Sequence, residues 1–599
     1  MLHVLDRTGA AATPPPQRLV ISMPERRLAP ASASLTFVCL AALSISAFSQ
    51  ERPNVQIGQA QIAVAHNGMV VAQEALAARV GVDILKKGGN AVDAAVAIGF
   101  AMAVTYPRAG NIGGGGFMVI HRRNGRDVAI DYRETAPRAI SDKSFLDAQG
   151  NADPQKSRFS ALAIGVPGTV AGLALAERKY GSGRFTLAQL IAPAIALARD
   201  GFPVTGETIE VPPSEPSRLL RWPSSAKIFF KPGGAAFVPG DRLVQGDLAN
   251  VLQAIARRGP RAFYEGAIGK KIAAAVQQAG GVMTASDLKH YRAVLRRPLK
   301  SRYRGYGIVT MPPPSSGGVE LIEMLNILEG YDLPHDDQTQ ELFLMIEAMK
   351  RAYADRALFL GDPDKVKVPV ARLTSKKYAA TWRATIDPAH ATHASAIRAG
   401  GAVTAEGRNT THFSVVDRYG NAVSNTYTLN FNYGLGLVAD GTGILLNNEL
   451  DDFAAKPESP NAYGLVGFTA NAPGPGKRPL SSMTPTIVLK HGKPFLITGS
   501  PGGSRITTAV LQVILNVLDR HMDIADAVSA PRVHNQWLPD QVYAEPGLPG
   551  DVLAALQARG DKVVAQRPFA SANSIVVAPD GSFIGAADPR THDGLATGY

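Results

Sequence analysis

A threonine at the start of a strand-like segment is the residue of this 599-residue chain with the clearest chemical potential. Thr410 follows Asn409 and begins the run Thr-Thr-His-Phe-Ser-Val-Val-Asp. If the chain is cut between these two residues, the new N-terminal threonine carries an α-amino group beside its own hydroxyl. An adjacent amine is a recognised base for activating a hydroxyl nucleophile. The sequence therefore predicts a self-activated nucleophile at Thr410.

The elements around Thr410 are predicted to form a hairpin. Residues 411–416 and 422–429 are rich in Val, Thr and aromatic side chains, and a turn containing Gly420 separates them. This arrangement would bring Thr428, on the returning strand, back beside Thr410. The local pattern alone also allows a plain edge hairpin in which threonine is frequent only because it suits strands.

The context of the hairpin favours chemistry. The segment from Thr410 to Gly434 resembles the start of the small subunit of the γ-glutamyltranspeptidases (glutathione hydrolases), an N-terminal-nucleophile family. The resemblance covers essentially everything after residue 55. Further blocks match in the same order: NIGGGGFMVI at 111–120, DYRETAP at 131–137, LLNNELDDF at 445–453, KRPLSSMTPT at 477–486, GSPGGSR at 499–505 and the C-terminal ADPRTHDGLATGY. Several ordered blocks are far more specific than one motif.

The resemblance implies an α/β (α+β) fold, arranged as a four-layer αββα sandwich with two stacked sheets. The residue pattern by itself supports only mixed α/β structure, with strand-rich regions around 410–450 and 484–500. It also predicts helices over 72–87 and 91–104, the second capped by Asn90. The four glycines of 113–116 lack the Lys-Ser/Thr of a phosphate-binding loop, so close backbone packing is the better explanation.

The family resemblance also implies autoprocessing. Thr410 Oγ would attack the Asn409 carbonyl, and hydrolysis of the resulting ester would yield a large subunit of 50–409 and a small subunit of 410–599, associated as a heterodimer. Thr410 would then attack γ-glutamyl amides such as glutathione. Water, an amino acid or a peptide would resolve the γ-glutamyl-enzyme.

The resemblance assigns site residues at matching positions. Gly502 and Gly503 would form the oxyanion hole, where glycine permits close approach. The guanidinium of Arg133 would bind the substrate α-carboxylate, a geometry that suits arginine. Ser481 and Ser482 would assist Arg133 in binding the carboxylate, and Asn430, Glu449 and Asp452 would bind the α-ammonium. Thr428 would be a hydrogen-bond partner of the nucleophile. Tyr463 would shield the pocket as part of a lid loop at 456–476.

Other interpretations stay open at this level. Without the resemblance, Ser-Pro-Gly-Gly-Ser is a simple turn, Arg133 and Glu134 form a surface ion pair, and residues 449–452 form a solvated acidic turn or weak calcium site, although the spacing does not fit an EF-hand. We expect no metal and no cofactor. His412 is interpreted as a structural neighbour of the nucleophile. Alternative functions are a cephalosporin (glutaryl-type) acylase of the same superfamily and a non-catalytic, unprocessed solute-binding relative.

The N-terminus is typical of a targeting segment. Residues 1–49 are interpreted as an extension and signal peptide, with Met23 as a possible start and an apolar region from Leu35 to Phe48 that is too short for a stable membrane span. The only cysteine, Cys39, lies in this region. We therefore expect a periplasmic or secreted enzyme. The net charge of +12 indicates a mildly basic surface rather than a nucleic-acid partner, because no dense basic block is present.

Overall fold

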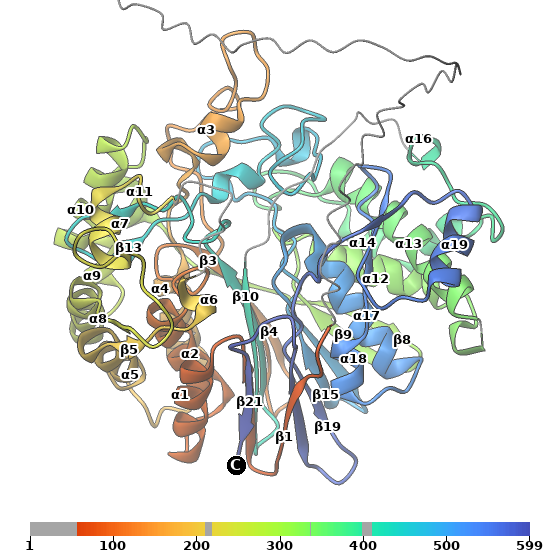
Figure 1. Ribbon diagram of the computed structural model, residues 1–599, viewed down its shortest axis with the longest axis horizontal. Helices are drawn as coiled ribbons and strands as arrows, with labels where there is room; N and C mark the ends of the chain where they lie inside the picture. The colour runs from red at the N-terminus through yellow and green to blue at the C-terminus, as the bar shows by residue number, and fades with distance from the viewer. Residues whose placement is uncertain (1–56, 210–217, 336, 398–409) are drawn as a thin grey trace, which may run out of the picture. The chain divides into compact units, whose positions relative to one another are not determined.

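The computed structural model describes residues 57–209, 218–335, 337–397 and 410–599. Two seven-stranded sheets, in which every pairing is antiparallel, form the centre (Figure 1). The first contains, in spatial order, β1 (Gln61–Ala65), β20 (Phe583–Ala587), β19 (Ser574–Val577), β15 (Lys493–Thr498), β14 (Thr486–Lys490), β9 (Tyr306–Thr310) and β8 (Leu299–Tyr303). The second contains β21 (Leu595–Gly598), β2 (Gly68–Ala72), β10 (Thr411–Asp417), β11 (Ala422–Thr428), β3 (Gly115–His121), β4 (Asp127–Asp131) and β7 (Val294–Arg296).

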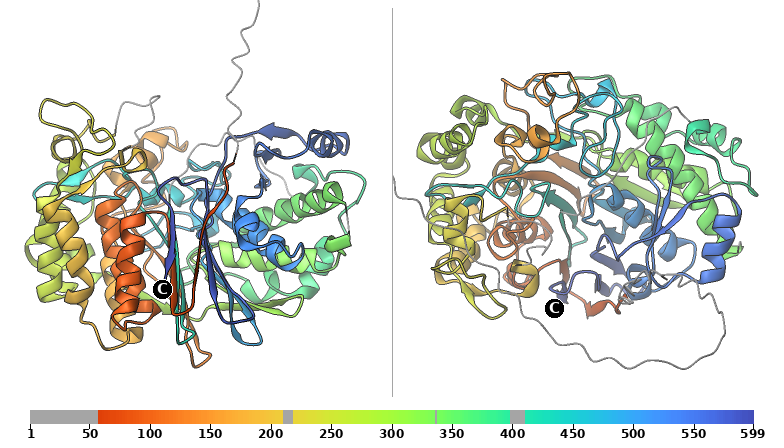
Figure 2. Two further views of the ribbon diagram at one scale, coloured as in Figure 1. Left: turned by 60° about the horizontal axis from the view of Figure 1, so that its bottom comes forward. Right: turned by 45° about the horizontal axis from the view of Figure 1, so that its top comes forward.

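Helices cover the outer faces of both sheets, as Figure 2 shows. The second sheet is covered by α1 (Ala75–Lys86), α2 (Ala91–Thr105) and α4 (Thr169–Tyr180). Outside them pack α5 (Leu187–Asp200) on α2 and α8 (Gly246–Arg258) on α5, with α9 (Arg261–Tyr264), α10 (Gly266–Gln278) and α11 (Ala285–His290) nearby. The first sheet is covered by α12 (Gly317–Leu328), α13 (Gln338–Phe359), α17 (Ile506–Leu518), α18 (Ile524–Ser529) and α19 (Gly550–Ala558). This arrangement confirms the predicted αββα sandwich.

Shorter elements complete the fold. They are the helical turns α3 (Pro154–Arg158), η1 (Ala161–Ala163), α6 (Gly206–Ile209), α7 (Pro223–Phe229), η2 (Leu333–His335), α14 (Val370–Leu373), α15 (Lys376–Arg383), α16 (Ala394–Ile397), η3 (Glu449–Asp452), η4 (Thr469–Asn471) and η5 (Gly503–Arg505). The remaining strands are β5 (Phe202–Pro203), β6 (Arg242–Leu243), β12 (Val438–Ala439), β13 (Ile444–Leu445), β16 (Val533–His534), β17 (Val542–Ala544) and β18 (Val563–Ala565).

The strand pattern explains how two cores form on one sheet. In β2, Val70 and Ala72 pack toward the helices α1 and α2, whereas Met69 and Val71 pack into the core between the sheets. Successive side chains of a strand point to opposite faces, so a strand buried on both faces is apolar without interruption. The hairpin of β10 and β11 lies in the middle of this sheet, between β2 and β3, which makes it rigid.

The predicted hairpin is confirmed, with strands at Thr411–Asp417 and Ala422–Thr428. It is not an edge hairpin, because β2 and β3 flank it. The predicted helix over 91–104 is confirmed as α2, and Asn90 and Asp93 form a reciprocal capping box. The helix predicted over 72–87 begins later, at Ala75: Ala72 belongs to β2, and the Glu74 side chain accepts from the amides of residues 76 and 77.

Some expectations concern residues outside the described part of the chain. These are the extension and signal peptide at 1–49 and the cleavage residue Asn409. Within the described residues, no helix is both long and apolar enough to cross a membrane, and no cluster of His, Cys, Asp and Glu side chains suitable for a metal ion is found.

Candidate active site

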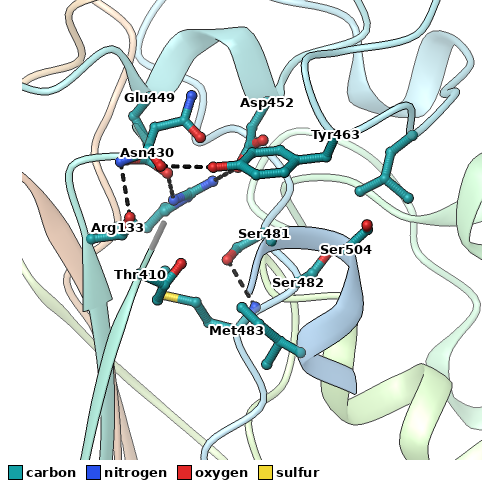
Figure 3. Close-up of a pocket in the computed structure, with 14 residues that line it drawn as sticks. Arg133, Thr410, Asn430, Glu449, Asp452, Tyr463, Ser481, Ser482, Met483 and Ser504 are labelled. Carbon is teal, nitrogen blue, oxygen red and sulfur yellow. Dashed lines mark hydrogen bonds and ion pairs between the residues drawn. The ribbon is translucent and has the colours of Figure 1, made fainter. Parts of the chain in front are cut away.

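A small pocket lies at the end of the β10–β11 hairpin, between the two sheets and the loops above them (Figure 3). Residues from seven separate segments of the chain line it: Arg133, Thr410, Thr428, Asn430, Glu449, Asp452, Tyr463, Leu465, Ser481, Ser482, Met483, Gly503, Ser504 and Ile506. Every predicted catalytic or binding residue is among them except Gly502, which directly precedes Gly503.

The nucleophile candidate is placed by the strand register. Thr411 pairs with Tyr427, so Thr410 and Thr428 are the next pair along the hairpin. Thr410 is 6% exposed, lies immediately before β10 and lines the pocket. The hydroxyl of Thr428 accepts a hydrogen bond from the Asn430 amide at 2.8 Å, which fixes the threonine at the strand end. The hairpin therefore presents both hydroxyl residues to one cavity.

The turn of Gly502 and Gly503 requires glycine. Gly502 has φ +131° and Gly503 has φ +59°, which is backbone space that other residues rarely adopt. A Cβ atom on Gly503 would lie 2.3 Å from the Tyr463 ring. Because of this close approach, the backbone of the turn lies beside the pocket. Backbone amides in such a turn are the donors that an oxyanion needs.

Arg133 is the only guanidinium that lines the described pocket, and its side chain is fully buried. One terminal nitrogen, Nη1, pairs with Glu449, and the other, Nη2, pairs with Asp452 Oδ2 at 2.5 Å. Its Nε donates to the carbonyl of Pro479 at 3.1 Å. The arginine is thus held in one orientation by these contacts. The ion pair with Glu134 is also present, at 3.7 Å, but both side chains are fully buried, so only its expected surface position is wrong.

The carboxylates of the pocket are strongly perturbed. Burial raises the pKa of Glu449 to about 8; Arg133 offsets part of the rise and Asp452 adds to it. Burial also raises the pKa of Asp452. Behind the arginine, burial and the charge of Glu449 raise the pKa of Glu134 well above its usual range. The turn 449–452 is therefore a buried acidic turn, and the expectation that it is solvated is wrong.

The predicted lid loop at 456–476 contributes Tyr463 and Leu465 to the lining of the pocket. The Tyr463 hydroxyl donates to the Asn430 carbonyl at 2.7 Å, and Asn461 donates to Asp452 Oδ1 at 3.0 Å. Asn430 itself has φ +75° and donates to the Asn448 carbonyl at 2.9 Å. Tyr463 is 4% exposed, so the loop is packed against the site in this structure.

Ser481 and Ser482 line the opposite side of the pocket. Ser481 Oγ accepts from the Met483 amide at 3.1 Å, which leaves its hydroxyl hydrogen available for another acceptor. His412, by contrast, is buried and bonded to Thr426 and Ser414 at 2.8 and 3.1 Å. Burial lowers its pKa to about 3. This neutral, structural histidine is not part of the pocket, as expected.

The sequence analysis did not predict several residues of the site. Leu465, Met483, Ser504 and Ile506 complete the lining. Leu465 lies in the predicted lid loop, and the other three lie within or beside a matched block. Asn447 was also missed: it donates to the carbonyls of Gly113 and Gly165 and accepts from the Glu449 amide at 3.0 Å. The pair Asn447–Asn448 directly before the acidic turn was the available signal, because buried amides often tie loops together.

Comparison with known proteins identifies the family. A family model described as gamma-glutamyltranspeptidase matches residues 77–598. The chain belongs to the γ-glutamyltranspeptidase family. The glutathione hydrolase proenzyme of Escherichia coli (strain K12) is 51% identical over 537 residues, which are 89% of this chain and 92% of that protein. Membership makes the chain an enzyme of the hydrolase and transferase type, with the N-terminal-nucleophile fold.

Solved structures agree with this family assignment. The cephalosporin acylase from Bacillus halodurans superposes with a TM-score of 0.79 at 30% identity and covers 92% of this chain and 98% of its own. The γ-glutamyltranspeptidase of Helicobacter pylori is 44% identical, with a TM-score of 0.53, and covers 58% of this chain and 96% of its own. Two proteins named for different activities share this fold, so the fold alone does not identify the substrate.

Proposed function

We propose that this chain is the precursor of a glutathione hydrolase and γ-glutamyltransferase whose nucleophile is Thr410. One observation carries the proposal: a single pocket combines Thr410 with a buried arginine and two buried carboxylates. A γ-glutamyl head group carries an α-carboxylate and an α-ammonium, so it requires groups of both signs. The family assignment and the curated relatives named as proenzymes support this reading.

The first step is cleavage before Thr410. Its Oγ attacks the carbonyl carbon of Asn409 and the peptide bond is replaced by an ester, while the amide nitrogen becomes the α-amino group of Thr410. Water then hydrolyses the ester. The products are a large subunit of 50–409 and a small subunit of 410–599. Each central sheet contains strands of both subunits hydrogen-bonded to one another, so we expect the two to stay together as a heterodimer.

In turnover the freed amine of Thr410 acts as the base. The hydroxyl attacks the γ-amide carbon of the donor, and its proton passes through the amine to the leaving nitrogen. The amides of the Gly502–Gly503 turn stabilise the oxyanion of the tetrahedral intermediate. Water, an amino acid or a peptide then takes the γ-glutamyl group from Thr410. Thr428 supports the nucleophile from the neighbouring strand.

Recognition of the head group follows from the charges around Arg133. The guanidinium and the hydroxyls of Ser481 and Ser482 bind the α-carboxylate. Asn430, Glu449 and Asp452 bind the α-ammonium. Glu449 Oε2 is buried and has no hydrogen-bond partner among the described residues. A buried acceptor without a partner is costly, and a substrate ammonium would satisfy it.

A glutaryl-type acylase is the second candidate, because a cephalosporin acylase shares the fold. A glutaryl group has a carboxylate but no ammonium. It would therefore leave Glu449 and Asp452 facing a methylene group. Their retention in the pocket favours the glutamyl donor. Export to the periplasm or the exterior, through a signal peptide around residues 23–49, completes the proposal.

Intact mass under denaturing conditions tests the cleavage. We expect wild type to give two fragments, the smaller beginning at Thr410, and Thr410→Ala to give one uncut chain without γ-glutamyl hydrolysis. Thr411→Ala is the matched control, because it changes the next threonine and should still be cut. A wild-type chain that folds but remains whole would overturn the proposed mechanism.

Side-by-side hydrolysis tests the substrate class. Processed enzyme is assayed with a γ-glutamyl anilide and with a glutaryl-type β-lactam at equal concentrations. We expect the anilide to be preferred by at least about 100-fold, since the acylase substrate leaves buried charges unpaired. Preference for the β-lactam would assign the chain to the acylases instead.

A further inference from the structure

The two serines at the far side of the pocket are held by a distant segment, residues 314–317. The Ser481 amide donates to the Pro314 carbonyl at 2.9 Å, and its carbonyl accepts from the Ser316 amide at 2.7 Å. Ser315 and Ser481 form a parallel bridge. A Cβ atom on Gly317 would lie 2.0 Å from Thr484 Oγ1. The two segments therefore touch backbone to backbone, and movement of one moves the other.

An arginine that does not line the pocket supports this contact from below. Arg356, on α13, is 3% exposed, and its Nε donates to Ser316 Oγ at 3.3 Å. The Ser316 hydroxyl in turn donates to the Ser481 carbonyl at 2.9 Å. Arg356 thus reaches the serines through a single intervening side chain.

The other side of Arg356 is fixed by a buried acid. Glu320, on α12, lies 3.3 Å from Arg356 Nε, and its second oxygen accepts from Thr507 Oγ1 at 3.0 Å. Thr507 is the second residue of α17, the helix that follows the Gly502–Gly503 turn. A continuous polar chain therefore runs from the first turn of α17, through Glu320, Arg356 and Ser316, to the serine turn.

The positive charge of Arg356 also affects Asp452, which lines the pocket. Burial raises the pKa of Asp452, and the positive charges of Arg133 and, after it, Arg356 offset part of that rise. Arg356 therefore has two routes to the ligand, one through Ser316 to the serine turn and one through its field. A buried ion pair with a purely structural role would need neither route.

We propose that Arg356 is a positioning residue for recognition of the α-carboxylate: through Ser316 it holds the Ser481–Ser482 turn where both hydroxyls and Arg133 can bind one carboxylate. This inference rests on the proposed function. It makes Arg356 a determinant of selectivity for donors with an α-carboxylate. It does not give Arg356 a part in bond making or breaking, which belongs to Thr410 at the other side of the pocket.

The test compares ligands with and without the α-carboxylate. Inhibition constants for L-glutamate and for 4-aminobutanoate, which lacks that group, are measured against γ-glutamyl anilide hydrolysis. For Arg356→Gln we expect the constant for L-glutamate and the KM of the anilide to rise about tenfold, with kcat changed less, because one charge-supported contact is lost. The constant for 4-aminobutanoate should rise by a smaller factor, because this ligand depends on Arg356 only through the charge of Asp452.

Two further variants separate positioning from folding. Ser316→Ala removes only the connecting hydroxyl and should shift the L-glutamate constant in the same direction by a smaller factor. Arg351→Gln is the matched control on the same helix: Arg351 is fully buried and pairs with Glu347 at 2.6 Å, but it contacts Thr385 and Thr392 rather than the pocket. It should lower the melting temperature without altering the ratio of the two inhibition constants.

The outcomes are distinct. A wild-type enzyme that does not hydrolyse the anilide defeats the proposed function, and this is measured first. If wild type is active and Arg356→Gln weakens both inhibitors equally, or changes only thermal stability, the positioning role is wrong. If Arg356→Gln does not fold or is not cut, Ser316→Ala decides: an unchanged ratio of constants would overturn the inference.

Discussion

The side of the pocket that carries Thr410 and the side that carries Arg133 are held in place by different interactions. The reaction wall, defined as Thr410, Thr428 and Gly503, stands on a central strand pair and a glycine turn. The recognition wall, defined as Arg133, Glu449 and Asp452, is held by ion pairs among buried side chains. Strand pairing is insensitive to pH, whereas buried ion pairs depend on protonation.

The difference suggests a division of labour. A nucleophile that must first cut its own chain needs an exact backbone, and the middle of a sheet supplies one. A head-group site must exchange internal ion pairs for contacts with a zwitterion. Arg133 can release neither carboxyl group in the empty pocket without depriving its own buried charge of a partner. The substrate supplies replacement charges of both signs, so the exchange becomes possible only with the matching ligand.

The largest effect is expected at the recognition wall from Arg133→Lys. Lysine keeps the charge but cannot bridge Glu449, Asp452 and a substrate carboxylate. We expect kcat/KM for a γ-glutamyl anilide to fall about 100-fold, equivalent to about 3 kcal/mol. Cleavage before Thr410 should remain complete by intact mass, because the reaction wall is untouched. Loss of cleavage in this variant would show that the two walls are not separable.

The sequence allowed the reaction wall to be predicted more completely than the recognition wall. Thr410 and Thr428 are neighbours because a short hairpin joins them, and hairpins are readable from alternation and turn residues. Arg133 and Glu449 are 316 residues apart, and only the family resemblance brought them together. Read locally, Arg133 with Glu134 is an ordinary surface pair.

The support beneath the pocket could not be predicted at all. Ser316 and Arg356 meet 40 residues apart, across two helices, and no periodic pattern marks the contact. The start of α1 was misplaced for a related reason: Ala72 is apolar on a strand as well as on a helix, and the cap at Glu74 is decided by the neighbouring sheet. Tertiary contacts decide whether such a residue belongs to a strand or a helix.

A moderate effect is expected where the two walls meet, from Tyr463→Phe. The ring packs against Gly503 on the reaction wall, and the hydroxyl donates to the Asn430 carbonyl at 2.7 Å. Removing the hydroxyl alone should lower kcat/KM about fivefold, because the lost hydrogen bond contributes about 1 kcal/mol.

A second tyrosine provides the control for this variant. The hydroxyl of Tyr433 donates to the Thr208 carbonyl at 2.6 Å, but the residue does not line the pocket. Tyr433→Phe should therefore lose similar stability in thermal unfolding while kcat/KM stays within about twofold. Equal kinetic losses in the two variants would mean that the lid bond acts on folding and not on the site.

At high pH we expect Glu449→Gln to have the smallest effect on kcat/KM. This variant is also the most direct test of the difference between the two walls. In the empty pocket the pKa of Glu449 is raised to about 8, so the side chain is largely protonated at pH 6–7. A bound ammonium favours the ionised form and lowers this pKa. Binding in that range therefore releases a proton, and kcat/KM should rise with pH until about pH 8, by at most about tenfold per pH unit.

Glutamine at position 449 cannot release that proton. The variant should therefore lose the contribution of Glu449 to the pH profile of kcat/KM below pH 8, while at pH 8.5 it should remain within about threefold of wild type, since a neutral hydrogen bond to the ammonium replaces a charged one. The profile of kcat, which reports the Thr410 amine in the bound enzyme, should keep its shape. If both profiles change together, protonation of the recognition wall also controls the reaction wall, and the division between them does not hold.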